Sequence, residues 1–130
     1  MGYKLLVVDD DKDIVDFFKD RLLREGYEVI TAFDGEEALM RIEENDPDIV
    51  LLDLIMPKLN GFDVLKKIRE VHKDRWRPVI VISAIGELEA IRESYSLEAD
   101  HYLTKPCDID NVLRGVRTMI SLMPARIKEY

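Results

Sequence analysis

The sequence has a single cysteine, Cys107, and therefore cannot form an internal disulfide bond. The fold must depend on packing alone, which suits a reducing compartment. The sequence also has no apolar run near the roughly 20 residues that a membrane helix needs, and residues 1–4 lack the basic and apolar segments of a signal peptide. These absences predict a cytoplasmic protein that does not associate with a membrane.

Positive charge is scarce relative to negative charge. The chain has 19 lysine and arginine residues against 27 aspartate and glutamate residues, which gives a net charge of −8. Such a charge repels the phosphate backbone of nucleic acids and anionic lipid surfaces, so we predict no direct contact with either. A length of 130 residues suits one domain with its own hydrophobic core.

What the sequence does contain is an alternation of short apolar runs with segments of helical periodicity. Such alternation is typical of parallel strands joined by crossover helices. Three of the runs show no polar alternation, which indicates strands buried on both faces, and the second run is more polar and suits an edge strand. The predicted strands are 5–8, 27–31, 49–52, 79–82 and 101–103.

Five amphipathic helices are expected between and after these strands. Gly26 suits the end of the first helix because glycine readily adopts a left-handed C-cap, and the second helix cannot continue through Pro47. A charged loop, 72–77, follows the third helix, and the fourth helix has only a thin apolar stripe. We predict a domain over 1–123 and a tail or linker over 124–130. The apolar stripe of the first helix comprises Ile14, Phe17, Phe18 and Leu22.

The order of these elements predicts an α/β fold, an open and doubly wound parallel sheet with helices on both faces. In such sheets ligands bind beyond the carboxyl ends of the strands, so the residues that directly follow each apolar run are candidates for a site. They are Asp9, Asp10 and Asp11 after the first strand, Asp53 after the third, Ser83 and Ala84 after the fourth, and Thr104, Lys105 and Pro106 after the fifth.

These residues bring carboxylates, a hydroxyl and an ammonium group together. Neighbouring carboxylates repel, which raises their proton affinity unless a cation lies between them. Mg²⁺ prefers oxygen ligands completed by water and phosphate oxygens. With a metal and a lysine to neutralise charge, and one carboxylate as nucleophile, such a site suits phosphoryl transfer.

Four segments of the sequence resemble the signature segments of response-regulator receiver domains, the CheY-like superfamily of two-component signalling. They are VVDDD at 7–11, LDLIMP at 52–57 followed by Gly61, ISA at 82–84 and ADHYLTKP at 99–106. They occur in the family's order and spacing, and the resemblance runs from about residue 4 to residue 123. It implies a flavodoxin-like fold whose five strands lie in the order 2-1-3-4-5.

The resemblance also implies a role for each site residue. Asp53 matches the phosphoacceptor, and Asp9 and Asp10 match the acidic pair that binds Mg²⁺ with it. A further Mg²⁺ ligand is the main-chain carbonyl of Ile55. The remaining matches are Ser83 and Lys105, which contact phosphoryl oxygens, Tyr102, the aromatic switch, and Pro106, which follows a cis peptide bond.

By the same resemblance, a sensor histidine kinase or a phosphotransfer protein donates the phosphoryl group to Asp53. Ser83 then moves toward the new oxygens and Tyr102 swings inward, which remodels the face formed by the fourth helix, the fifth strand and the fifth helix. That face acts on a downstream protein or a fused output domain, and it also allows a homodimer. Such a domain catalyses only its own phosphorylation and slow dephosphorylation and is not a turnover enzyme on a separate substrate.

The sequence departs from the family pattern at several positions. Ile55 and Ile85 lie two residues beyond Asp53 and Ser83, where the family's side chains flank the phosphoryl group, and both are bulky and apolar. We expect them to obstruct the hydrolytic water and to prolong the life of the phosphoaspartate. Three further replacements lie away from the proposed chemistry: Glu98, His101 and Cys107.

Other interpretations of these residues remain open at the level of sequence. An aspartate-nucleophile phosphatase would carry a second acid where the chain has Ile55, and a flavodoxin relative would need a hydroxyl- and glycine-rich loop where it has three aspartates. An unphosphorylated interaction module would lack one of the site residues. Asp11 suits an N-cap better than a ligand, and Tyr102 suits simple packing as well as a switch.

Overall fold

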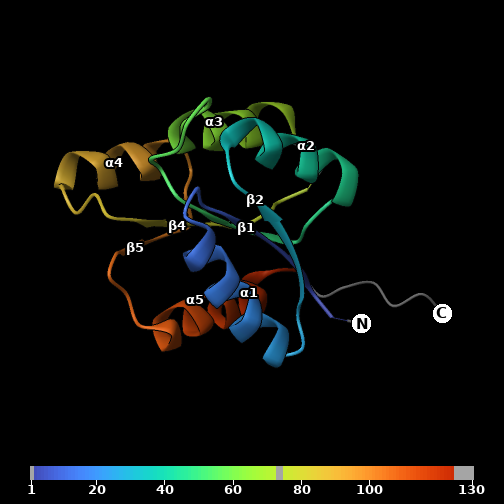
Figure 1. The fold of residues 1–130 in the computed structure, drawn as a ribbon. Helices are drawn as coiled ribbons and strands as arrows, with labels where there is room; N and C mark the ends of the chain where they lie inside the picture. The colour runs from blue at the N-terminus through green and yellow to red at the C-terminus, as the bar shows by residue number, and fades with distance from the viewer. Residues whose placement is uncertain (1, 73–74, 125–130) are drawn as a thin grey trace.

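One sheet of five parallel strands forms the middle layer of the protein (Figure 1). The computed structural model describes residues 2–72 and 75–124. The strands are β1 (Lys4–Val8), β2 (Glu28–Ala32), β3 (Ile49–Leu52), β4 (Val79–Ser83) and β5 (His101–Thr104). They lie in the order β2-β1-β3-β4-β5, which confirms the predicted fold and strand order.

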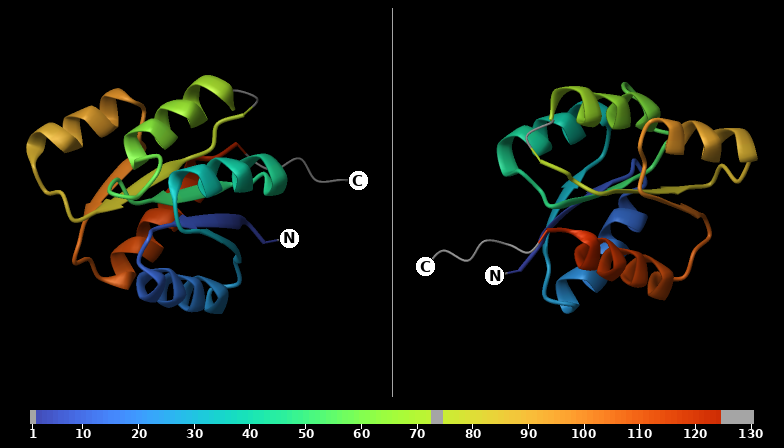
Figure 2. Two further views of the ribbon diagram at one scale, coloured as in Figure 1. Left: turned by 45° about the horizontal axis from the view of Figure 1, so that its top comes forward. Right: turned by 180° about the vertical axis from the view of Figure 1, so that it is seen from behind.

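Five helices cover the two faces of this sheet. They are α1 (Lys12–Arg24), α2 (Gly35–Asn45), α3 (Gly61–Val71), α4 (Leu88–Ser96) and α5 (Ile109–Leu122). The first and fifth helices cover one face, and α2, α3 and α4 cover the other (Figure 2). In the ranges that the structure describes, the helices are too short or too polar to cross a bilayer.

The central strands are apolar throughout because helices bury both of their faces. Leu6 and Val8 of β1 pack into the half of the core that α2 and α3 share, and Leu5 and Val7 pack into the half on the side of α1 and α5. The register pairs Val8 with Leu52 and Leu52 with Val81. Because the three central strands are in register, their carboxyl ends meet at one edge of the sheet.

The ends of the helices follow local signals in the sequence. Asp11 caps α1, as predicted, by accepting hydrogen bonds from two main-chain N–H groups of the first turn. Gly26, just beyond the end of α1, takes a left-handed φ of 91°. The N–H of Tyr27 donates to the carbonyl of Leu22 at 3.3 Å. Tyr27 therefore takes part in capping the carboxyl end of α1, and β2 begins one residue later than predicted.

Helix α4 is the most thinly packed of the helices described. Ser94 is its one buried residue, and its N-cap, Glu87, makes no side-chain hydrogen bond to the first turn. The thin apolar stripe predicted weak packing of this helix. Residues 73 and 74 of the predicted charged loop and 125–130 of the predicted tail lie outside the described residues.

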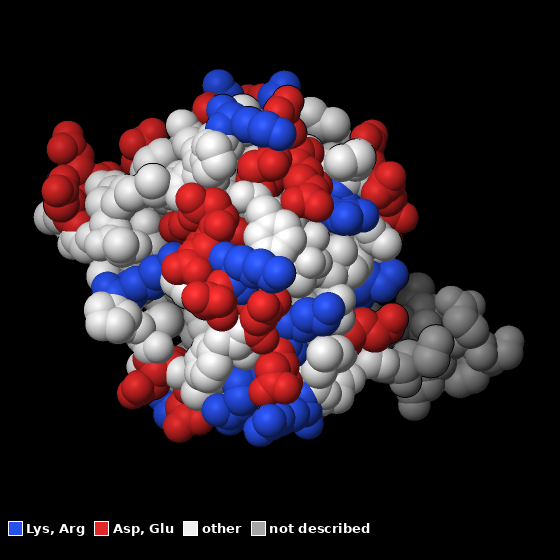
Figure 3. All heavy atoms as spheres, viewed as in Figure 1, with Lys and Arg blue, Asp and Glu red and all other residues white. Residues whose placement is uncertain are grey.

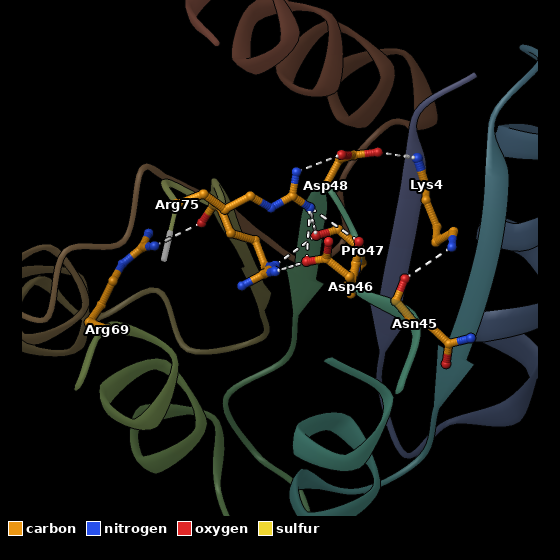
Figure 4. A network of polar contacts seen from close by, with 8 residues as sticks. Lys4, Asn45, Asp46, Pro47, Asp48, Arg69 and Arg75 are labelled. Carbon is orange, nitrogen blue, oxygen red and sulfur yellow. Dashed lines mark hydrogen bonds and ion pairs between the residues drawn. The ribbon is translucent and has the colours of Figure 1, made fainter. Parts of the chain in front are cut away.

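A network of polar contacts closes the amino ends of β1, β3 and β4 (Figure 4). The carboxylate of Asp48 accepts hydrogen bonds from the N–H of Lys4 at 2.7 Å and from the guanidinium of Arg75 at 3.0 Å. Arg77 is 1% exposed, and its Nε donates to the carbonyl of Pro47 at 2.6 Å. Buried charges are tolerated only when they are paired and hydrogen-bonded, and this network meets that condition while holding three strands in place.

Asp100 joins three elements at the same end of the sheet. Its carboxylate accepts hydrogen bonds from the N–H of Val79 at 2.8 Å, from Arg69 Nη2 at 2.8 Å and from Trp76 Nε1 at 3.2 Å. Asp100 therefore fastens the start of β5 to the start of β4 and to α3.

Replacing Asp100 with alanine is expected to lower the free energy of unfolding by about 1–3 kcal/mol, because the N–H of Val79 loses its acceptor. Trp76 is the one tryptophan of the chain, so its emission should shift to longer wavelength as its indole N–H turns to water. Asp100→Asn keeps a side-chain acceptor and should lose less. An unchanged urea midpoint for Asp100→Ala would contradict this role.

Candidate functional site

Three carboxylates converge at the carboxyl ends of β1 and β3. Ligand oxygens of Asp9, Asp10 and Asp53 all lie within 4.8 Å of one another, and in the described part of the chain this is the one such group able to hold a metal ion. Asp9 and Asp53 are 3% and 6% exposed, whereas Asp10 is open to solvent. The N–H of Asp53 donates to the carbonyl of Val8 at 3.0 Å, which ties the ends of the two strands together.

Lys105, directly after β5, lies against this cluster. Its Nζ is 2.6 Å from Oδ2 of Asp9 and 3.7 Å from Oδ2 of Asp53. Its main-chain N–H donates to the carbonyl of Ser83 at 2.8 Å, and its peptide bond to Pro106 is cis. A positive charge therefore faces two buried carboxylates.

A glycine lets the loop after β3 fold back onto the end of its own strand. Gly61 begins α3, and its N–H donates to the carbonyl of Leu54 at 2.8 Å. A Cβ at this position would lie 2.3 Å from the carbonyl oxygen of Asp53, so no larger residue fits without a shift of the backbone. Within this loop the N–H of Ile55 approaches Oδ1 of Asp53 at 3.5 Å.

The surroundings of Asp53 oppose its ionisation. Burial, and next the charge of Asp9, raise the pKa of Asp53 from 3.8 to about 6, although Lys105 acts in the opposite direction. Burial disfavours the charge on Lys105, but the hydrogen bond with Asp9 and the charge of Asp53 outweigh it, so the pKa of Lys105 is raised. The lysine is therefore charged at neutral pH, and the repulsion left between the two carboxylates favours a second cation.

Ser83 and Tyr102 meet at the loop between β4 and α4. Ser83 is fully buried, and its Oγ accepts the N–H of Ile85 at 3.2 Å. The hydroxyl of Tyr102 donates to the carbonyl of the same residue, and burial raises the pKa of that hydroxyl. The two predicted switch residues thus both bind Ile85.

The structure brings most of the predicted site residues together. Asp9, Asp10, Asp53 and Lys105 are in direct reach of one another, and Ser83 lies at the next strand end, joined to the main chain of Lys105. A donor set of carboxylate oxygens suits Mg²⁺ and not a softer transition metal. His101 and Cys107 are not members of this cluster.

The surface around the site is largely acidic. Figure 3 shows acidic side chains gathered across the middle of this face, over the start of α1, with a few basic side chains among them. Asp10 and Asp11, which directly precede α1, are exposed. Such a surface draws cations toward the buried carboxylates.

An apolar hollow beside Lys105 was missed by the sequence prediction. It has a volume of about 510 Å³ and is lined by Asp13, Ile14, Phe17, Phe18, Ala84, Lys105, Pro106 and Cys107. Phe17, which helical spacing placed on the buried stripe of α1, is 51% exposed, whereas Phe18 is 7% exposed. Two adjacent residues of a helix point about 100° apart, so that spacing already contained the signal that one of the two rings must lie near the surface.

Comparisons with known proteins agree on one family. A family model described as the response regulator receiver domain matches residues 5–117. The chain is 42% identical over 120 residues to the alkaline phosphatase synthesis transcriptional regulatory protein PhoP of Bacillus subtilis, covering 92% of the chain and 49% of that protein. It is 40% identical over 118 residues to the transcriptional regulatory protein CpxR of Escherichia coli, covering 90% and 49%. The chain thus spans about half the length of these curated relatives.

Solved structures give the same result. The Francisella response regulator 1452 receiver domain superposes with a TM-score of 0.87 at 37% identity, covering 93% of this chain and 98% of that one. A chain of the CheX-CheY-BeF3-Mg²⁺ complex from Borrelia burgdorferi superposes with a TM-score of 0.85 at 34% identity, covering 91% and 89%.

Replacing Asp53 with asparagine is expected to stabilise the metal-free protein at neutral pH by about 1–3 kcal/mol. Folding raises the pKa of Asp53 from 3.8 to about 6, so the folded state binds this proton more tightly than the unfolded state. The ionised Asp53 carboxylate does not destabilise the folded state below about pH 4. The destabilisation grows as the pH rises to about 6 and reaches its full value above that. Urea unfolding of both proteins in EDTA, at about pH 4 and at neutral pH, measures this difference in the free energy of unfolding. A difference between the two proteins that is independent of pH would contradict the assignment.

Proposed function

The chain belongs to the response regulator receiver domain family of two-component systems, and we propose that it accepts a phosphoryl group on Asp53 in a Mg²⁺-dependent reaction. The donor is a sensor histidine kinase or a phosphotransfer protein. Receiver domains are signalling domains and not turnover enzymes. The observation that carries the proposal is the buried pair of carboxylates, Asp9 and Asp53, with the ammonium group of Lys105 at 2.6 Å and 3.7 Å from them.

Each residue of the cluster has a distinct part in the transfer. An oxygen of the Asp53 carboxylate attacks phosphorus, the bond from phosphorus to the donor's imidazole nitrogen breaks, and an acyl phosphate forms. Lys105 stays charged and neutralises the phosphoryl oxygens. Asp9 and Asp10, together with Asp53 and the main-chain carbonyl of Ile55, would hold Mg²⁺, which supplies further charge neutralisation and orients the phosphoryl group.

The response to phosphorylation runs through the loop between β4 and α4. The hydroxyl of Ser83 turns from the N–H of Ile85 toward a phosphoryl oxygen, and Tyr102 follows the same loop because its hydroxyl binds the carbonyl of Ile85. Helix α4 buries a single side chain, Ser94, so its displacement costs little packing energy. The surface formed by α4, β5 and α5 is thereby changed, and a ligand that prefers the changed surface completes the switch.

The signal must pass from this domain to another protein or to another domain. The relatives named above are transcriptional regulators about twice as long as this chain, which supports a role for residues 1–123 as the receiver part of such a regulator or as a free-standing signalling domain. We propose that it acts in the cytoplasm on a downstream protein or a fused output domain, and that a homodimer forms through the α4, β5 and α5 face. Its net charge of −8 supports the absence of direct nucleic-acid contact.

Phosphorylation of Asp53 is tested with a small-molecule donor. Acetyl phosphate and Mg²⁺ should add one phosphoryl group to the wild-type chain, seen by mass spectrometry of the intact protein, and Asp53→Asn should remain unlabelled. Asp20→Asn, which alters an exposed aspartate of α1 paired with Arg24, is the matched control and should label normally. Full labelling of Asp53→Asn would show that another residue is the acceptor.

The lifetime of the phosphoaspartate is expected to be long because Ile55, 58% exposed beside the site, cannot orient an attacking water. Ile55→Asn should shorten the half-life several-fold, because an amide can hold water near the acyl phosphate. Val71→Asn changes an equally exposed apolar residue at the far end of α3 and should leave the half-life unchanged. A wild-type half-life of seconds, followed by release of inorganic phosphate, would overturn this expectation.

A further inference from the structure

The amino end of α2 touches the main chain of the loop that joins β3 to α3, at a position where a side chain would not fit. A Cβ built on Gly35 would lie 2.0 Å from the carbonyl oxygen of Leu59 and 2.6 Å from its Cβ. Real Cβ atoms do not approach a backbone so closely, so either α2 or the loop would have to move if position 35 carried any side chain. Gly35 has no conformational need to be glycine, since a helical φ suits alanine better. The glycine therefore serves the contact with Leu59.

Several contacts hold the half of the loop between β3 and α3 that leads into α3. At the α3 end, Gly61 packs against the main chain of Asp53 and donates to the carbonyl of Leu54. Just before that, Leu59 packs against the apolar core shared by α2 and α3. Lys58 takes a left-handed φ of 68°, and its Nζ lies 3.6 Å from Asp34, the N-cap of α2.

This loop also touches the phosphoacceptor directly. The N–H of Ile55 approaches Oδ1 of Asp53 at 3.5 Å. Three residues lie between Ile55 and Leu59, the residue in contact with Gly35, and Met56 among them is buried. A shift of Leu59 therefore passes along a short and partly anchored segment to the main chain beside the Asp53 carboxylate.

We propose that Gly35 is a positioning residue of the phosphorylation site: it lets α2 press on the main chain of Leu59, and this contact sets the main chain at Ile55 and the orientation of Asp53 for Mg²⁺. The inference rests on the proposed function, in which Asp53 and the Ile55 carbonyl hold the metal. Groups that orient metal ligands without touching the metal commonly change its affinity by about 10- to 100-fold when they are lost. Helix α2 thereby becomes part of the site although none of its side chains reaches the cluster.

The test compares Gly35→Ala with Gly26→Ala by calorimetric titration with Mg²⁺ alone. Gly35→Ala should raise the dissociation constant for Mg²⁺ about tenfold, and the amide resonance of Ile55 should move in the metal-free protein. Gly26→Ala is the matched control, because it also strains the fold, through a left-handed φ of 91°, but its Cβ would meet nothing within 4 Å. It should lower the thermal midpoint while the Mg²⁺ constant stays at the wild-type value.

The outcomes separate this inference from the proposed function. If the wild-type chain binds no Mg²⁺, the proposed function itself fails. If it binds Mg²⁺ and a folded Gly35→Ala binds with the same constant, only the role of Gly35 is overturned. Should Gly35→Ala fail to fold, Leu59→Ala keeps the atoms that meet Gly35 but removes the side-chain packing that holds the main chain of Leu59 in place. That variant must raise the Mg²⁺ constant relative to Gly26→Ala, and an unchanged constant would again overturn the role.

Discussion

Two carboxylates and one ammonium group share a buried place at the carboxyl ends of the strands, and the chemistry of the site follows from this imbalance of charge. Asp9 and Asp53 are both almost fully buried, and Lys105 lies between them. Burial, and next the charge of Asp9, raise the pKa of Asp53 to about 6, and the single ammonium group of Lys105 does not offset them. The site therefore holds an electrostatic repulsion that a divalent cation would relieve, and the phosphoryl group proposed for Asp53 would bring its own charge to the same place.

The fold supplies this arrangement through its parallel sheet. Parallel strands in register end at one edge, so the residues after β1 and β3 become neighbours although they are far apart in the sequence. The opposite edge is closed by the charge network around Asp48 and Arg77 and by the contacts of Asp100. Because ion pairs and hydrogen bonds fasten one end of the sheet, the charge repulsion at the other end can be kept for function.

The strands, their order and the acidic site were predictable because each depends on a local pattern or on a motif. Apolar runs mark buried strands, and Asp53 follows such a run directly. The sequence predictions failed where contacts between different segments determine the local structure. The N–H of Tyr27 caps the carboxyl end of α1 by donating to the carbonyl of Leu22, so β2 begins after Tyr27. Phe17 turns toward a hollow built partly by a distant loop. The contact of Gly35 with Leu59 depends on how α2 packs beside the β3–α3 loop, which no local pattern of the sequence records.

A crystal structure of the chain with Mg²⁺ and beryllofluoride, which imitates a phosphoryl group, would show whether the acidic cluster binds the metal beside a group on Asp53. The account predicts a metal ion about 2.1 Å from carboxylate oxygens of the acidic cluster, beryllium bonded to Asp53, and fluorine atoms in contact with Ser83 Oγ and Lys105 Nζ. Density for the metal at any other place, or an Asp53 side chain turned away from Asp9 with no beryllium attached, would contradict it.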